Sequence, residues 1–253
     1  MGGKIECYLD IVSYYSYIGF VQLQQNKELL RHNGIEVELH PCLIGGINAG
    51  SGNRPPWLLP AKAKHSKYES KRAARAVGLM NISVPGDLMK VSKTMLPMRA
   101  LTYIKSAFPE EVYTTAFAYL FHAFWTLHKV PNSAPVLAEV LSEIPEGFRL
   151  SCFNSSASST TPNPASSSKK LFTSEQITQI LDAASMAEMK AALKARVDEA
   201  LARGAFGAPW IWATDAQGRS EPFFGSDRWH FVYDFLGLPY QKLQLLSPEK
   251  ARL

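Results

Sequence analysis

Two serines near the start of the chain, Ser13 and Ser16, stand where an apolar stretch ends and a helical pattern begins. The free backbone N–H groups and the dipole at a helix start favour an anion, and a thiolate is one such anion. The same spacing also suits a serine that only caps the helix. Ser13 is therefore predicted either to bind a thiol or to cap the helix.

The residues around these serines predict a β-α-β unit. Apolar side chains alternate with polar ones over residues 4–9 and again over residues 35–39, as in half-buried strands. Residues 16–30 carry apolar side chains at helical spacing between the two strands. A helix of that length joins two parallel strands by a right-handed crossover. Ligands of such sheets bind beyond the carboxyl end of the strands, which places the site at residues 10–16.

The rest of the chain is predicted to hold a helical block and then a second piece of sheet. Helical spacing extends over residues 62–203, where Thr173 and Gln176 have the spacing of a capping box and Gly204 stops the last helix. A hairpin of residues 210–213 and 221–224 follows, and a final helix is expected to begin at Ser226. The fold class is therefore α/β, with a sheet interrupted by a helical insertion. The predicted domains are residues 1–61, 62–203 and 204–253.

The composition and the charge pattern argue against several classes of function. The chain has 46% hydrophobic and 19% charged residues, as in a globular protein. The net charge of +5 is scattered and lacks a basic module, so no nucleic-acid partner is expected. No apolar run is long enough for membrane insertion, and no secretion signal is visible. Residues 152–170 contain a serine-rich stretch without large apolar side chains and are expected to be a disordered loop. The three cysteines lie far apart, so no metal is expected and a reducing compartment fits best.

Four sequence blocks resemble those of kappa-class glutathione transferases. Residues 10–20 read DIVSYYSYIGF, and the family pattern there is Asp-x-x-Ser-Pro-Tyr-Ser-Trp-x-Gly-Phe. Residues 51–56 (SGNRPP), 204–209 (GAFGAP) and 224–228 (FGSDR) agree in the same order. The resemblance implies a thioredoxin-like fold, related to bacterial disulfide oxidoreductases. Those relatives carry Cys-x-x-Cys where this chain has two serines, and a hydroxyl cannot form a mixed disulfide.

The resemblance implies glutathione as co-substrate and gives a role to named residues. Ser13 is the catalytic residue, donating a hydrogen bond to the glutathione sulfur so that the thiolate is stabilised and attacks a small electrophile. The resemblance also implies peroxide reduction as a further expected activity of that site. Tyr14 departs from the family pattern, since a proline is usual there. The implied glutathione-binding residues are Ser13, Tyr14, Tyr15, Asn53, Ala208, Pro209, Ser226 and Asp227.

Two alternatives stay open: a glutathione-dependent isomerase of the 2-hydroxychromene-2-carboxylate type, and a non-catalytic assembly or chaperone protein on the same fold. A homodimer is expected through apolar helix faces, with Phe121, Phe124 and Trp125 as examples. The terminal tripeptide of Ala251, Arg252 and Leu253 parallels a peroxisomal signal, so an import receptor is an expected partner. The peroxisome is the expected location, with the mitochondrion as the alternative.

Overall fold

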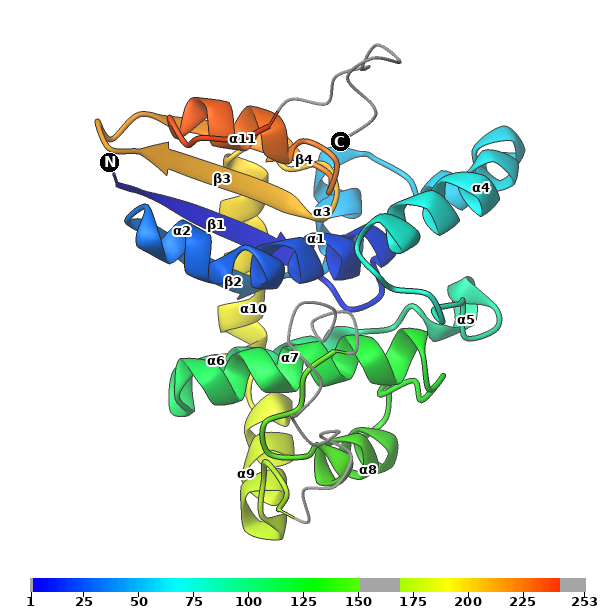
Figure 1. Ribbon diagram of the computed structural model, residues 1–253. Coiled ribbons are helices and arrows are strands. Elements are labelled where there is room, and N and C mark those ends of the chain that lie inside the picture. The colour runs from blue at the N-terminus through cyan, green and yellow to red at the C-terminus, as the bar shows by residue number, and fades with distance from the viewer. Residues whose placement is uncertain (1, 151–168, 242–253) are drawn as a thin grey trace, which may run out of the picture.

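A four-stranded sheet forms the centre of the computed structural model, which describes residues 2–150 and 169–241 (Figure 1). Its strands are β1 (Gly3–Leu9), β2 (Ile35–Pro41), β3 (Trp210–Asp215) and β4 (Ser220–Phe224), in the order β2-β1-β3-β4. β1 runs parallel to β2 and antiparallel to β3, and β4 runs antiparallel to β3. The predicted β-α-β unit and hairpin are confirmed, and they form a single sheet.

The crossover from β1 to β2 contains two helices where the sequence predicted one. α1 (Tyr14–Gln25) ends at Asn26, whose side-chain amide donates to the Gln22 carbonyl, and α2 (Lys27–His32) follows. Asn26 is both the C-cap of α1 and the N-cap of α2, and its φ of −103° and ψ of 4° lie outside the helical range, so the helix is broken at this residue.

Helices cover both faces of the sheet. On one face Ile5, Cys7 and Ile211 belong to the core that includes α1 and α11 (Trp229–Phe235). On the other, Tyr8 and Trp210 pack with α3 (Ile44–Ser51) and with α10 (Ala187–Ala202), which Figure 1 shows passing behind the sheet. Because successive side chains of β1 point to opposite faces of the sheet, they pack into two separate apolar layers.

The helices between β2 and β3 extend the molecule away from the sheet. In Figure 1, α6 to α9 lie to one side of the sheet and α4 projects outward. α9 begins with the predicted capping box of Thr173 and Gln176. The helices of this part, with one 3-10 turn η1, are η1 (Pro56–Leu58), α4 (Pro60–Ala76), α5 (Leu88–Val91), α6 (Met95–Ala107), α7 (Glu110–Trp125), α8 (Ala134–Glu143), α9 (Ser174–Ser185) and α10 (Ala187–Ala202).

Three sequence-based expectations need correction. Phe121, Phe124 and Trp125 are buried within the chain itself, so they cannot supply a dimer surface. The final helix begins at Trp229 rather than at Ser226. Lys170, assigned to the disordered loop, forms a bridge with Pro145.

Some expectations lie outside the described residues. These are the remainder of the serine-rich loop and the terminal tripeptide of residues 251–253. No helix of the described part is both long and apolar enough to cross a membrane. The domain bounds and the homodimer stay predictions.

Candidate functional site

Ser13 caps α1 and at the same time contacts the loop before β3. Its side-chain oxygen accepts a hydrogen bond from the backbone N–H of Ser16 at 3.1 Å, which makes it the N-cap. Its hydroxyl donates to the Ala208 carbonyl at 2.8 Å, across 195 residues of sequence. Both predictions for Ser13 are thus compatible, because the cap uses a lone pair and leaves the hydroxyl proton for a second partner.

The loop before β3 is held in a fixed position against α1. The Ala208–Pro209 peptide bond is cis, and the Pro209 carbonyl accepts a hydrogen bond from the Gly225 N–H at 3.1 Å. A Cβ atom on Gly19 would lie 3.4 Å from Pro209 Cγ and 3.8 Å from Ser226 Cβ. The predicted site residues Pro209 and Ser226 therefore pack against the second turn of α1, at a distance that would also accept a methyl group.

The first turn of α1, which faces the loop before β3, has backbone N–H groups that make no hydrogen bond to the part of the chain that the structure describes. Within residues 2–150 and 169–241, no partner is recorded for the backbone N–H groups of Tyr14 and Tyr15, the first two residues of the helix. The amides of Ser16 and Tyr17 are already bonded to Ser13. Free N–H groups at a helix start carry partial positive charge and suit an anion.

Tyr14 is fixed by its ring and its hydroxyl, and the Tyr15 ring meets the Tyr14 ring edge-on at 5.9 Å. Tyr14 donates to the Ser70 carbonyl at 3.1 Å, and its ring meets Trp125 edge-on at 5.1 Å. Burial raises the pKa of Tyr14 to about 12, and burial followed by the nearby Glu69 and Asp227 charges raises the pKa of Tyr15. Both phenols are therefore neutral at physiological pH and act as walls or hydrogen-bond donors.

The Asn53 side chain also contacts the loop before β3. Its side-chain amide donates to the Phe206 carbonyl at 2.6 Å, while its side-chain oxygen accepts from the Arg54 N–H at 2.8 Å. Asn53 follows the C-cap of α3, Gly52, which adopts a φ of 74°. Asn53 thus bonds to Phe206, which lies two residues before Ala208 in the loop that Ser13 contacts.

Ser226 and Asp227 differ from each other in environment. Ser226 is buried, whereas Asp227 is mostly exposed and pairs with the Arg228 guanidinium at 2.6 Å. Neither residue caps α11, since its N-cap is Arg228. Gly225 adopts a φ of 92°, and this turn separates β4 from the helix by more residues than sequence reasoning allowed.

A buried carboxylate beneath the site escaped the sequence-based analysis. Asp10 is fully buried and accepts hydrogen bonds from the Val12 N–H at 3.2 Å, the Ile44 N–H at 2.8 Å and the Thr94 hydroxyl at 3.1 Å. Burial raises the pKa of Asp10 to about 6, against the lowering effect of these bonds. The aspartate was visible in the first sequence block, but its partner Thr94 lies 84 residues away and carries no local signal.

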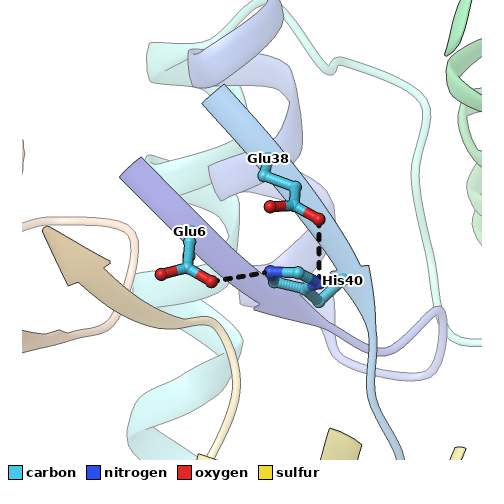
Figure 2. Close-up of side chains that lie close together, drawn as sticks. All are labelled: Glu6, Glu38 and His40. Atoms are coloured by element: carbon cyan, nitrogen blue, oxygen red, sulfur yellow. Dashed lines mark hydrogen bonds and ion pairs between the residues drawn. The ribbon is translucent and has the colours of Figure 1, made fainter. Parts of the chain in front are cut away.

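A second polar cluster lies away from Ser13, on β1 and β2. Glu6, Glu38 and His40 come within 4.8 Å of one another, and Figure 2 shows both carboxylates directed at the His40 ring. His40 Nε2 contacts Glu6 at 3.1 Å, and Lys105 donates both to His40 Nδ1 at 2.9 Å and to Glu38 at 2.6 Å.

The charges of this cluster are balanced by basic side chains rather than by a cation site. Lys4 pairs with Glu38 at 2.6 Å, and Arg203 pairs with Glu6 at 3.0 Å. Burial, and then the positive charge of Lys105, lowers the pKa of His40 to about 3, so the ring is neutral. The ligand atoms a metal would use are already occupied, and the cluster fastens β1 and β2 to α6 and α10.

Comparisons with known proteins support the thioredoxin-like fold. Residues 4–145 match the family described as the DSBA-like thioredoxin domain. The chain is 25% identical over 252 residues to glutathione S-transferase kappa 1 of Caenorhabditis elegans, covering 99% of this chain and 98% of that protein. It is 27% identical to human glutathione S-transferase kappa 1, covering 92% of this chain and 90% of the relative.

Solved structures resemble the fold at lower identity. A 2-hydroxychromene-2-carboxylate isomerase superposes with a TM-score of 0.66 at 16% identity, covering 92% of this chain and 94% of the other. The cytosolic disulfide reductase DsbM of Pseudomonas aeruginosa, solved with glutathione, superposes with a TM-score of 0.55 at 15% identity, covering 92% and 97%.

Proposed function

Because this chain belongs to the DSBA-like thioredoxin domain family, we propose that its Ser13 site binds glutathione and that the protein is a glutathione transferase. The full-length similarity to glutathione S-transferases kappa supports this activity. The observation that carries the proposal is the position of the Ser13 hydroxyl. It lies at the start of α1 and within hydrogen-bond distance of the Ala208 carbonyl beside a cis proline.

Binding of glutathione would replace the hydrogen bond between Ser13 and Ala208 by two hydrogen bonds, one between each of these residues and glutathione. The Ser13 hydroxyl has a single proton, which now goes to the Ala208 carbonyl. The cysteinyl N–H of glutathione is a donor that can replace it at that carbonyl, in the manner of an added strand. The hydroxyl then turns to the glutathione sulfur, while the oxygen still accepts the Ser16 N–H and keeps the helix capped.

The thiol loses its proton to solvent, and the thiolate is stabilised by two groups. The Ser13 hydroxyl donates one charge-assisted hydrogen bond, worth about 1.5 to 3 kcal/mol, or one to two pKa units. The free amides of Tyr14 and Tyr15 add the positive end of the helix dipole. The thiolate then attacks the electrophile, because the thiolate and not the thiol is the nucleophile.

Three further residues are proposed to hold the ends of glutathione. Asn53 lies where a glycyl end could displace its bond to the Phe206 carbonyl. Ser226 and Asp227 follow the turn that bonds to Pro209, and the Asp227 carboxylate suits the γ-glutamyl ammonium. The tripeptide would extend along the loop before β3, with its sulfur at Ser13.

The proposal is tested by titrating the thiol of bound glutathione through the ultraviolet absorbance of its thiolate. Ser13→Ala is expected to raise the thiol pKa by about one to two units and to lower conjugation of 1-chloro-2,4-dinitrobenzene at neutral pH about tenfold or more. Ser16→Ala is the matched control, since Ser16 is buried and its hydroxyl lies 3.5 Å from the Asp10 N–H. An equal thiol pKa in all three proteins would contradict the role of Ser13.

Activity measurements with other substrates separate the transferase from the alternative functions. Turnover of hydroperoxides would add peroxide reduction, and turnover of a 2-hydroxychromene-2-carboxylate without loss of glutathione would favour an isomerase. A protein that does not bind glutathione at all would favour the non-catalytic reading. The homodimer and the peroxisomal import receptor stay predictions beside this proposal.

A further inference from the structure

A small cavity lies between Tyr14 at the start of α1 and the last turns of α4. Its volume is about 170 Å³. One wall is Tyr14, the residue that directly follows Ser13. We refer to this cavity as the Tyr14 pocket, and its other lining residues are Lys71, Ala74, Arg75, Leu79, Met80 and Ile82.

The pocket has a rigid apolar wall. The Tyr14 ring is held by its hydrogen bond to Ser70 and by its edge contact with Trp125. Ala74 and Leu79 are buried and form an apolar base, while Met80 is largely exposed at the rim. A flat ring can lie against such surfaces, since aromatic rings stack or meet edge-on at centroid distances of about 4.5 to 7 Å.

The rim of the pocket carries unbalanced positive charge. Lys71 and Arg75 are one turn apart on α4 and both line the pocket. In the part of the chain that the structure describes, no carboxylate forms an ion pair with either of them. The single acidic residue of α4, Glu69, contacts Arg72 at 3.2 Å instead. Two cations that line the same pocket and have no ion-pair partner among the described residues attract an anionic group.

We propose that the Tyr14 pocket binds the electrophilic substrate and selects planar electrophiles that carry a carboxylate. The ring lies against Tyr14 and the apolar base, and the carboxylate meets Lys71 and Arg75. This inference rests on the proposed glutathione transferase activity and names its acceptor class. For an aryl chloride the thiolate sulfur forms a bond to the ring carbon, the carbon–chlorine bond breaks, and chloride leaves with the electron pair. The carboxylate takes no part in the bond changes.

The test compares two electrophiles of one shape, 4-chloro-3-nitrobenzoate and 4-chloro-3-nitrobenzamide. The wild-type protein is expected to have a KM for the benzoate about five- to tenfold below that for the benzamide, as two exposed ion pairs would give. Replacing both Lys71 and Arg75 by Gln is expected to remove this difference by raising the KM of the benzoate alone. Values of kcat and the KM for glutathione should stay unchanged.

A matched double variant controls for net charge. Lys190→Gln with Lys194→Gln removes two exposed cations with the same spacing from α10 and should preserve the benzoate preference. Equal KM values for the two electrophiles in the wild type, or a benzoate preference that survives loss of Lys71 and Arg75, would overturn the pocket assignment. Conjugation of the benzamide reports separately on the glutathione transferase activity, so failure of that activity is distinguishable.

Discussion

The Asp10 carboxylate accepts a hydrogen bond from the backbone N–H of Ile44 at 2.8 Å, which joins the end of β1 to the first turn of α3. Ser13 follows Asp10 by three residues, and Asn53 follows the other end of α3. The Thr94 hydroxyl brings the start of α6 to the same carboxylate. One buried side chain thus fixes the position of Ser13, proposed to bind the sulfur of glutathione, relative to Asn53, proposed to bind its glycyl end.

Asp10→Asn should make the protein more sensitive to acid. The pKa of Asp10 is raised to about 6 in the folded protein, mainly by burial, and is near 3.8 when the chain is unfolded. Between these values the folded state binds more protons, so Asp10 makes the free energy of unfolding rise as pH falls. Removing it should steepen the loss of stability between pH 6 and 4 by about 1.4 kcal/mol per pH unit.

Urea unfolding of both proteins over that pH range measures the effect. The slope is the quantity to compare, because the amide also weakens the bonds to Ile44 and Thr94 at every pH. Parallel curves for the two proteins would show that Asp10 does not titrate in this range.

His40→Gln should change the pH dependence in the opposite direction. Burial, and then the Lys105 charge, lowers the pKa of His40 from 6.5 to about 3 in the folded protein. The stability that the neutral ring provides is fully present above pH 6.5 and is lost as pH falls toward 3, because the unfolded chain binds the proton first. Glutamine cannot titrate, so the variant should have a flatter curve below pH 6.5, by about 1.4 kcal/mol per pH unit at most. A curve with the wild-type slope would contradict the shifted pKa.

Substitution of Asn53 should act on glutathione rather than on the electrophile. Asn53→Ala removes the donor that now bonds the Phe206 carbonyl, and the KM for glutathione is expected to rise about three- to tenfold, the equivalent of one hydrogen bond. Asn53→Asp should raise it further, since a carboxylate cannot donate and would repel the glycyl carboxylate. Initial rates at varied glutathione measure both, and an unchanged KM in the Asp variant would exclude Asn53 from the site.

Local patterns in the sequence predicted the helices and strands, whereas the long-range contacts around Ser13 did not follow from them. Alternation in β1 and β2 and the Thr173 capping box are short-range signals, and each was confirmed. The apolar face of α7 was also read correctly as apolar, but local periodicity cannot say what covers it. In the structure Phe121 stacks on Tyr17 at 4.9 Å, so the chain buries this face itself. Asp10 with Thr94 is a pair of the same kind, since only the fold brings the two together.

Two neighbouring glycines of α3 should respond to alanine with opposite signs. A Cβ atom on Gly45 would meet nothing within 4 Å, so Gly45→Ala should stabilise the protein by about 0.5 to 1 kcal/mol through helix propensity. A Cβ atom on Gly46 would lie 3.0 Å from Val197 Cγ1 and 3.4 Å from Val197 Cγ2. Val197 is buried and β-branched, so it cannot rotate away freely, and the overpacking should cost about 1 to 3 kcal/mol.

The Gly45→Ala and Gly46→Ala variants also test whether the packing of α3 positions the proposed glutathione site. Gly46→Ala should push α3 off α10 and, through the end of the helix, displace Asn53, whereas Gly45→Ala should leave it in place. We therefore expect a raised KM for glutathione only in the Gly46 variant, measured beside urea unfolding of both proteins. A Gly46 variant that is destabilised yet keeps the wild-type KM would show that Asn53 does not depend on the packing of α3. A Gly46 variant as stable as the Gly45 variant would show that Val197 yields to the added methyl group.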